Sequence, residues 1–469
     1  MGKQMAGPGI RYFHMARTLS LHVSVTLALA LADERHADAD LAHLQAQLPN
    51  ARLLPYRPGE WGDVMAAAAS AQVIVLASDL VYIMPPLTGS QAALVIDGYD
   101  PLLAEWLSME VPRGHAEMIP WWQSRMRQLQ PQYLAGDFYI CASERQRDWW
   151  LGLLEANGRI NPWTFGQDPS LRRLVDVVAY GLPDEEPEHT RSVIKGVWPG
   201  IQPEDKLILW GGGLWQWLDP LTAVRAVAKI WPQRQDVRLI FPGTKHPNPI
   251  HAQIPNHVAA AKELAASLGL LDRAIFFGDW IDYADWVNVL LEADVAISLH
   301  FETLETRLSS RTRILEYMWA GLPTVATQGD VVGTVAAGYG LAALVPTQDA
   351  DAVAAAILDS LDAPQAGYTQ PAQLARQDLA WSQVLRPLID FCKDPHMAPD
   401  RGPLIEKIGP PYFSETWATQ EIRLSEAEGR NIDLSAENQS LRALIGQYEQ
   451  GRFMRLMRGI HQVRQRWFR

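Results

Sequence analysis

Short β-rich apolar runs alternate with helical stretches along most of this chain, and this alternation constrains the fold more than any other feature. Several of the runs are apolar at nearly every position, which is typical of parallel strands buried on both faces of a sheet. Because the helical stretches have the spacing of βαβ units, each half is predicted to be a doubly wound α/β domain. The twelve predicted strands begin at His22, Ala51, Ala71, Ala92, Asp137, Leu174, Lys206, Arg238, Ala274, Ala293, Pro323 and Ala343.

The domain boundaries follow from the places where this alternation stops. Residues 182–202 are polar and interrupted by prolines, so they are predicted to link two domains. The character of the sequence changes again after Pro399. We therefore expect an N-terminal Rossmann-like domain over residues 1–190, a second over 191–400, and a helical tail over 401–469.

The tail shows two helical patterns. Residues 424–448 follow a heptad repeat with two asparagines at a positions, the pattern of a weak but specific coiled coil that would pair two copies of the chain. Residues 452–469 contain six arginines and no acid, and their apolar residues recur on one helical face. A basic amphipathic helix of this kind is typical of binding to an anionic membrane surface. The alternative is a helix packed on the body of the protein or, for the first segment, one that frays in solvent.

Composition excludes several classes of protein. With a net charge of −12, the chain is not expected to bind nucleic acid. Its two cysteines, Cys141 and Cys392, lie too far apart for a disulfide framework or a cysteine metal cluster, which fits a reducing compartment. The apolar run 19–32 is shorter than the roughly 20 residues that cross a bilayer, and it does not follow the n-region of a secretory signal. We therefore expect a cytoplasmic protein.

A first glycine motif lies near the start, where Gly7 and Gly9 flank Pro8 just before a predicted helix that carries Arg11. Glycine permits a tight turn that brings backbone close to a ligand, and the unpaired N–H groups of a helix N-terminus attract anions. The motif therefore predicts a ligand-facing turn. The alternative is an ordinary turn between a strand and a helix.

A second motif consists of the three glycines 211–213, which follow a predicted buried strand and precede a helix that starts at Asp219 and Pro220. Backbone without side chains can approach a diphosphate, and the dipole of the following helix would face it. The motif is neither the G-x-G-x-x-G of dinucleotide-binding enzymes nor a Walker sequence with its lysine. The alternative is a tight turn with no ligand.

The third motif, residues 298–330, is the most specific. A predicted strand ends at His300, a polar loop follows, and a helix then runs to Gly321. Hydroxyl and guanidinium groups at a helix N-terminus suit a phosphate, and Glu316, one turn further on, is placed to reach ribose hydroxyls. The alternative is a solvated charged loop. The polar residues of the loop are Glu302, Glu305, Ser309, Ser310, Arg311, Thr312 and Arg313.

Together these motifs resemble those of retaining glycosyltransferases of the GT-B fold, family 4, and in particular the branch that makes bacterial surface polysaccharides. The resemblance covers about residues 5–395 and is carried by the stretches GPGIR, WGGGLW and LEYMWAGLPTVAT. It implies two Rossmann-like domains that face a cleft, with a nucleotide-diphospho-sugar donor bound to the second and a lipid-linked or other saccharide acceptor to the first. It further implies transfer with retention at the cytoplasmic membrane face, with no metal or other cofactor.

The resemblance also implies roles for individual residues. Glu316 matches the glutamate that binds ribose, and Lys245 and Arg313 are placed to neutralise the diphosphate. Asp97 and Asp100 are placed to face the reacting sugar. The implied catalytic residues are Asp97, Asp100, Glu305 and Arg311. The implied donor-binding residues are Gly211, Gly212, Gly213, Trp215, Lys245, Ser309, Ser310, Arg311, Thr312, Arg313 and Glu316. The implied acceptor-binding residues are Gly7, Pro8, Gly9 and Arg11.

The sequence departs from this family in two places. The family has a first glutamate eight positions before the ribose glutamate, where this chain has Leu308, so Glu305 or Glu302 would take its place through a longer loop. Only six residues precede Gly7, whereas a central β-strand should lead into this motif, and its loss would expose two inner sheet edges. We therefore expect the natural chain to start upstream of Met1.

Two other functions stay open: a sugar-nucleotide epimerase of the same fold, and an inactive GT-B scaffold that assembles a complex through its coiled coil. Sugar-nucleotide turnover distinguishes the three, since it gives transfer, isomerisation without transfer, or neither. Among the histidines, His14 is predicted to be a core residue rather than an acceptor contact, and His300 is assigned equally to the core or the cleft. No set of His, Asp and Glu has the spacing of a metal site.

Overall fold

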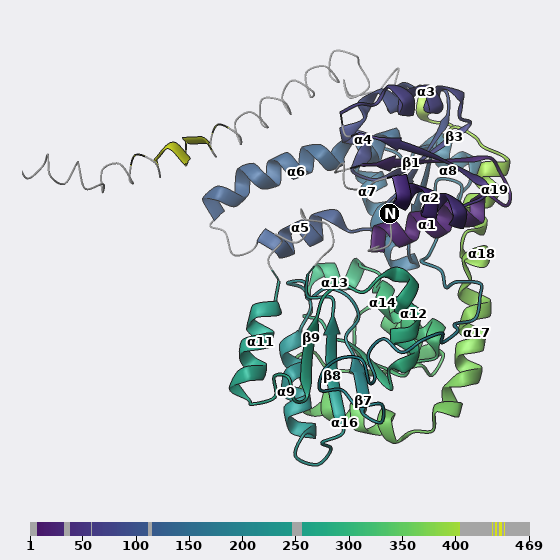
Figure 1. Ribbon diagram of the computed structural model, residues 1–469. Coiled ribbons are helices and arrows are strands. Elements are labelled where there is room, and N and C mark those ends of the chain that lie inside the picture. Colours follow the sequence, from purple (N-terminus) through teal and green to yellow (C-terminus); the bar gives the residue numbers. More distant parts are fainter. Residues whose placement is uncertain are drawn as a thin grey trace, which may run out of the picture. The chain divides into compact units, whose positions relative to one another are not determined.

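The computed structural model describes residues 7–31, 38–57, 59–110, 115–245 and 256–403, together with seven positions between 434 and 445. All twelve predicted strands are confirmed, and each starts between one residue before and three residues after its predicted position. Every pair of neighbouring strands that the structure describes is parallel (Figure 1). The predicted α/β class is therefore the observed one.

The N-terminal half of the chain, which carries β1 to β6, forms two parallel sheets. One contains β1 and β2, and the other has the order β3-β4-β5-β6. Among the described residues, β1 and β3 each have one edge without a strand partner. The two sheets share no strand pairing among the described residues. The elements are α1 (Gly7–Leu19), β1 (Val25–Ala30), α2 (Asp38–Gln47), β2 (Ala51–Tyr56), α3 (Gly62–Ser70), β3 (Val73–Ala77), α4 (Leu80–Ile83), β4 (Ala93–Asp97), α5 (Leu102–Glu110), α6 (His115–Ala135), β5 (Phe138–Cys141), α7 (Glu144–Ala156), α8 (Pro162–Gln167) and β6 (Val175–Val177).

The C-terminal half forms a single parallel sheet in the order β12-β11-β10-β7-β8-β9. The strand order reverses between β7 and β10, and in doubly wound sheets ligands bind outside the carboxyl ends of the strands at such a point. The glycine motif after β7 and the polar loop after β10 both lie there. The elements are β7 (Lys206–Leu209), α9 (Pro220–Ile230), β8 (Val237–Pro242), α11 (Val258–Ser267), β9 (Ile275–Gly278), α12 (Tyr283–Glu292), β10 (Val295–Ser298), α13 (Leu304–Leu308), α14 (Thr312–Ala320), β11 (Thr324–Thr327), α15 (Val331–Gly338), β12 (Ala342–Val345) and α16 (Ala350–Asp362).

After α16 the chain returns to the N-terminal half through α17 (Thr369–Leu379), α18 (Trp381–Val384) and α19 (Arg386–Lys393) (Figure 1). The Phe391 ring stacks on Phe138 of β5, with ring centroids 4.7 Å apart. Residues 394–401, which we term the strap, continue along the same half. The chain thus crosses between its two halves twice, once before β7 and once after α16.

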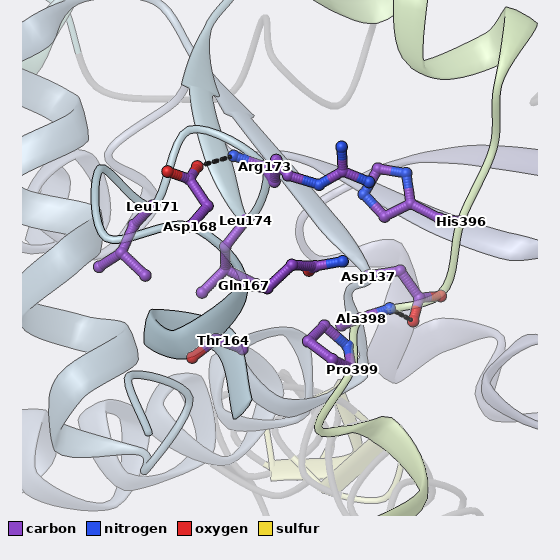
Figure 2. Close-up of a pocket in the computed structure, with 10 residues that line it drawn as sticks. All are labelled: Asp137, Thr164, Gln167, Asp168, Leu171, Arg173, Leu174, His396, Ala398 and Pro399. Atoms are coloured by element: carbon purple, nitrogen blue, oxygen red, sulfur yellow. Dashed lines mark hydrogen bonds between the residues drawn. The ribbon is translucent and has the colours of Figure 1, made fainter. Parts of the chain in front are cut away.

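The strap is fixed by buried carboxylates. The Ala398 N–H donates to Asp137 Oδ1 at 2.9 Å (Figure 2), and Arg401 donates to Oδ2 of the same residue at 2.6 Å. Asp400 accepts two hydrogen bonds from Arg159, at 2.7 and 3.0 Å. The pocket beside the strap has a volume of about 10 Å³, which holds at most one water molecule and no substrate.

The compact unit ends at Arg401, and residues from Gly402 onward form a second unit. In that second unit the described positions between 434 and 445 are helical. Most of the predicted coiled coil over 424–448, and the whole predicted basic helix over 452–469, lie outside the described residues. None of the helices that the structure describes is both long enough and apolar enough to cross a bilayer.

Candidate active site

The glycine motif after β7 is shaped by close contacts that exclude side chains. The Gly211 N–H donates to the Tyr317 hydroxyl at 2.7 Å, and a Cβ on Gly211 would lie 2.7 Å from the same oxygen. Gly212 has a φ of 78°, in the left-handed region that glycine favours. A Cβ on Gly243, after β8, would lie 3.1 Å from the Gly212 carbonyl oxygen. The two loops therefore form a bare backbone surface at the carboxyl edge of the sheet.

Arg313, in the first turn of α14, lies against this surface. Its Nη2 donates to the Gly213 carbonyl at a long 3.3 Å, and its guanidinium carbon lies 5.5 Å from the centre of the Trp210 ring. Its Nη1 is buried and has no hydrogen-bond partner within the described ranges. Burial lowers the pKa of Arg313, and the neighbouring charge of Arg311 adds to the effect. The site thus holds a desolvated cation with an unused donor, which an anion would stabilise.

A cavity of about 480 Å³ lies on the other face of α14, large enough for a nucleoside. Thr312 and Glu316 open onto it from α14, and Trp286 opens onto it from α12. The Trp286 indole N–H donates to Glu316 Oε2 at 2.9 Å. Burial raises the pKa of Glu316 to about 7, although the hydrogen bond from Trp286 and the charge of Arg313 lower it.

The same cavity extends to the N-terminal half. Its aromatic lining comes from both halves and consists of Phe13, Tyr180, Tyr283, Trp286, Trp319 and Trp381. The His14 ring is buried, as predicted, but it also lines this cavity; it stacks on Trp381 at 5.4 Å and lies with Nε2 3.1 Å from the Tyr283 hydroxyl. Burial lowers the pKa of His14 to about 3, so the ring is neutral at pH 7.

The N-terminal glycine motif meets the start of α14. A Cβ on Gly7 would lie 4.0 Å from the Thr312 hydroxyl, and the Tyr180 hydroxyl donates to the Gly7 carbonyl. The prediction of a turn before the helix is corrected here, because α1 begins at Gly7 and so includes Pro8 and Gly9 in its first turn. The motif therefore presents a helix end to the start of α14.

Two of the implied catalytic residues pair with each other. Arg311 donates to both oxygens of Glu305, at 2.7 and 2.6 Å, and the Ser309 hydroxyl donates to the same carboxylate at 2.6 Å. All three side chains are buried. Both oxygens of Glu305 already accept hydrogen bonds from these donors. We therefore expect the pair to fix the conformation of the loop rather than to exchange protons. Leu308, which stands in place of the family glutamate, is a buried apolar residue.

Asp97 and Arg11 form a second buried pair of the same kind. Arg11 donates to Asp97 Oδ2 at 2.7 Å and to Oδ1 at 2.8 Å, and also to the Val178 carbonyl at 3.0 Å. The Arg11 guanidinium lies 4.7 Å from the centre of the Tyr99 ring. Both charged side chains have no exposed surface. The implied roles, acceptor contact for Arg11 and sugar contact for Asp97, need exposed groups, and this structure buries both.

Asp100 is the implied catalytic residue that stays partly accessible. Burial raises its pKa to about 7, and the negative charge of Asp97 contributes. Glu105 on α5, which sequence reasoning missed, has its pKa raised by burial and then by the charges of Asp100 and Glu305. The α5 helix packs on α13, so these acids gather where the two halves meet. The signal available in the sequence was an acid one turn into the helix after β4.

Contacts from α7 hold the two halves together beside this cluster. Gln146 donates to the carbonyls of Tyr99 and Leu308, both at 2.6 Å. Arg145 donates to the carbonyls of Arg307 at 3.0 Å and Gly329 at 2.6 Å. These residues therefore connect the end of β4 to the loop that precedes α14.

The other implied residues lie at the margin of the site. Lys245 is exposed after β8, Ser310 is half-buried before α14, and Glu302 is exposed. Trp215 stacks on Trp217, with centroids 5.9 Å apart.

His300 is buried, and both of its ring nitrogens lack a partner within the described ranges. The polar loop also contains a short helix, α13, which the sequence did not predict. No group of three or more potential metal ligands forms among the described residues, and metal independence stays a prediction.

The raised pKa of Glu316 predicts a pH-dependent stability. A carboxyl whose folded pKa exceeds its unfolded value stabilises the fold at low pH, and this stability is lost as the pH rises to the folded value. The glutamine of Glu316→Gln cannot ionise. The free energy of unfolding of the variant minus that of the wild type should therefore increase from about pH 4.5 to pH 7 and stay constant above pH 7. Urea unfolding without nucleotide measures this difference. Glu302→Gln, at an exposed position, is the control; a constant difference for Glu316→Gln would contradict the prediction.

Comparison with known proteins places the site in a family context. Residues 205–363 match the family model of glycosyl transferases group 1. No curated protein matches the chain significantly in sequence. Sucrose-phosphate synthase from Thermosynechococcus elongatus has a similar structure, with a TM-score of 0.59 at 14% identity over 84% of this chain and 95% of its own.

Two further solved structures extend the comparison. HepE from Anabaena, in complex with UDP-glucose, has a TM-score of 0.59 at 14% identity, covering 84% of this chain and 98% of its own. WaaG, a glycosyltransferase involved in lipopolysaccharide biosynthesis, has a TM-score of 0.52 at 14% identity over the same shares. These likenesses establish the fold, and the family match covers the half that holds Arg313 and Glu316. The chain is therefore a glycosyltransferase of the GT-B fold.

Proposed function

We propose that the protein transfers a sugar from a nucleotide-diphospho-sugar to a saccharide acceptor, with retention and without a metal. We further propose that it belongs to family 4, within the branch that makes cell-surface polysaccharides. The observation that carries the proposal is Arg313, which has an unused buried donor beside a bare glycine loop and follows Thr312, a residue that lines the nucleoside-sized cavity on the other face of the same helix.

The donor would lie along the N-terminal end of α14. Its diphosphate would contact the glycines 211–213 and Arg313, and its ribose hydroxyls would face Glu316. In transfer, the bond from the sugar C1 to the phosphate oxygen breaks, and negative charge grows on the departing diphosphate. Fixed N–H groups and cations aimed at that charge are worth more in a water-poor site than in water.

The acceptor would approach from the N-terminal half. Its hydroxyl oxygen bonds to C1 on the face that the diphosphate leaves, and its proton passes to a base. In both Glu305 and Asp97, each carboxylate oxygen accepts a hydrogen bond from an arginine. Among the acids that the resemblance implies to be catalytic, Asp100 is therefore the one best placed to take the proton. A pKa of about 7 suits a group that exchanges protons near neutral pH.

The solved neighbours support this choice of substrates. HepE was solved with UDP-glucose, so UDP-sugars are the first donors to test. WaaG acts in lipopolysaccharide biosynthesis, which favours a lipid-linked acceptor here. Action at the cytoplasmic face of the membrane, membrane binding through residues 452–469 and pairing through 424–448 remain proposals that rest on the sequence.

A thermal-shift screen of UDP-, GDP-, dTDP- and CMP-sugars tests donor binding. A nucleotide-sugar at about 100 times its Kd should add about 2.7 kcal/mol to the stability of the folded state. We expect one base to give this response, and the nucleoside of the same base, which has no diphosphate, to give much less. A protein that responds to no nucleotide-sugar would contradict the proposal.

Turnover of the responding donor then separates the three functions. Transfer to a saccharide acceptor supports the proposal. Isomerisation of the sugar without transfer would identify an epimerase, and binding without either reaction would identify a scaffold protein.

A further inference from the structure

His300 is a buried histidine whose ring makes no hydrogen bond to any part of the chain that the structure describes. The residue is 1% exposed, and both Nδ1 and Nε2 lack a partner there. The other buried histidine among the described residues, His14, has the Tyr283 hydroxyl 3.1 Å from its Nε2. A buried polar group without a partner lowers stability, so such groups in a folded protein need a functional explanation. The ring is therefore a candidate for contact with a ligand.

The backbone of His300 is fixed by three other segments. Its N–H donates to the Thr327 hydroxyl, at the end of β11, and its carbonyl accepts from the Thr347 hydroxyl, after β12, both at 3.2 Å. Leu218, just before α9, pairs with it in an antiparallel bridge. The ring thus has a fixed origin at the carboxyl end of β10, and a side chain on rigid backbone is suited to recognise a ligand precisely.

The ring lies on the face of the sheet that α14 covers. Along an extended strand, side chains alternate between the two faces. Ile297 and Leu299 belong to the apolar cluster that contains α9, whereas Ala296 belongs to the cluster that contains Ile314 of α14. His300 follows Ala296 by four positions, an even number, so the two share a face. The strand order reverses at β10, and ligands bind at the carboxyl edge of the sheet at such a point.

Other polar side chains near the end of β10 and the start of α14 also have unused hydrogen-bonding atoms. Ser298 Oγ, Arg311 Nε and Arg313 Nη1 are buried and have no partner within the described ranges. The charges of Arg311 and of its partner Glu305 act on the ring of His300. A group of buried polar atoms of this kind, at this edge of a doubly wound sheet, indicates a site for a polar ligand.

The chemistry of the ring distinguishes the parts of a nucleotide-sugar. Burial lowers the pKa of His300 to about 4, and the charge of Arg311 adds to the effect. The charge of Glu305 and the backbone of Phe301 and Thr327 act in the opposite direction. The ring is neutral at pH 7, so one nitrogen donates and the other accepts. The oxygens of a diphosphate diester only accept, and they would leave the accepting nitrogen unpaired. Sugar hydroxyls both donate and accept, so they suit both nitrogens.

The transferred sugar would lie near this ring. In the proposed function the diphosphate contacts Arg313 and the proton passes to Asp100, so the sugar lies between them. Glu305, whose charge acts on His300, is carried by α13, and α13 packs on α5, which begins two residues after Asp100. We propose that His300 is a specificity-determining residue that binds hydroxyl groups of the donor sugar through its ring nitrogens. This inference rests on the proposed function and names the contact that would select the sugar.

The enclosed position of the ring requires the loop after it to move when the donor enters. Residues 307 and 308 of this loop accept hydrogen bonds from Arg145 and Gln146 of α7. The sugar would reach His300 while these contacts between the two halves are broken, and it would be enclosed when they form again.

Titration calorimetry on His300→Leu tests the proposal, since leucine is apolar and cannot replace either hydrogen bond. The probes are the nucleotide-sugar that responds in the thermal-shift screen, the nucleoside diphosphate of the same base, and analogues of that nucleotide-sugar that each lack one sugar hydroxyl. His300→Gln is the second variant, because its amide has both a donor and an acceptor. His257→Leu is the matched control, since the Nε2 of this half-buried histidine already has the Gln216 carbonyl at 3.2 Å.

We expect His300→Leu to weaken binding of the nucleotide-sugar about tenfold and to leave binding of the nucleoside diphosphate unchanged. In the parent protein, at least one deoxy analogue should bind more weakly than the complete nucleotide-sugar. In His300→Leu these two should bind equally, because the partner of that hydroxyl is gone. His300→Gln should recover part of the affinity, and His257→Leu should bind both nucleotides as the parent does. Without nucleotide, His300→Leu should melt no lower than the parent, since it removes an unpaired buried polar group.

Three outcomes would overturn the proposal. Equal weakening of both nucleotides by His300→Leu, with or without a lower melting temperature, would show that the ring maintains the shape of the site or contacts the diphosphate. Unchanged binding of both would identify a core residue. If His300→Leu does not fold, His300→Gln must still weaken the nucleotide-sugar alone, and a failure to do so counts against the sugar contact. A parent protein that binds neither nucleotide would refute the proposed function itself, so the two failures are distinguishable.

Discussion

Replacing Arg313 by methionine should lower the rate of sugar transfer about 100- to 1,000-fold, the range seen when one preorganised donor to a developing anion is removed. The physical reason is the position of its guanidinium, which is desolvated, lies beside the Gly213 carbonyl and has an unused N–H. Methionine keeps an unbranched apolar stem that can pack near Trp210, but it is shorter than arginine and provides no charge or N–H donor. Steady-state transfer rates at saturating donor measure the effect.

Two variants sharpen this test. Arg313→Lys keeps the charge without the planar fork, so it should recover part of the rate. Lys245→Met removes an exposed cation from the neighbouring loop and should cost much less. If Arg313→Met and Lys245→Met slow the reaction equally, charge in general rather than the placement of Arg313 stabilises the departing diphosphate.

Asp400→Ala should lower the free energy of unfolding by about 3–5 kcal/mol, because it leaves the buried Arg159 without a carboxylate. Arg159 is 1% exposed and Asp400 not at all, and the carboxylate also accepts a hydrogen bond from Asn161 at 2.9 Å. Urea unfolding at neutral pH measures the loss. The double variant Arg159→Met with Asp400→Leu should recover much of it, because neither partner is then a buried charge.

Asp351→Ala provides the matched control. Asp351 pairs with Lys229 at 2.7 Å, but the two side chains are 82% and 47% exposed. Surface pairs of this kind contribute about 0–1 kcal/mol. An Asp400→Ala variant no less stable than Asp351→Ala would show that the strap does not depend on its buried charge pair.

The central strands could be predicted because burial on both faces gives them an apolar run that the flanking segments lack. The strands β4, β5, β10 and β11 are buried at every position. The donor loop could be placed for a related reason: Gly211 and Arg313 follow strands that are adjacent in the sheet, and the carboxyl ends of parallel strands share one edge. Local pattern and strand order together therefore located the site.

The charge pairs could not be predicted in the same way. Arg11 and Asp97 are 86 positions apart, and no sequence pattern indicates that a guanidinium saturates a given carboxylate. The pairing of Glu305 with Arg311 could not be predicted either, although the two residues are only six positions apart. They meet because the chain between them forms the end of α13. Glu105 was missed because part of its environment, Glu305 and Arg311, comes from the opposite half. Which acids stay free to react is a property of tertiary packing.

The strap has a consequence for how the protein is made. Arg159 and Asp400 are 241 positions apart, so a ribosome exposes the guanidinium long before it synthesises the carboxylate that neutralises it. During that interval the N-terminal half contains Arg159 without its carboxylate partner, at a site that is buried in the finished fold. Asp137 likewise lacks its partner until Arg401 is synthesised. Domains generally fold in the order of synthesis, but here the half made first is completed by some of the last residues of the compact unit. Fragments that stop before residue 400 should therefore make poor soluble proteins, and searches for a minimal catalytic piece should keep the strap.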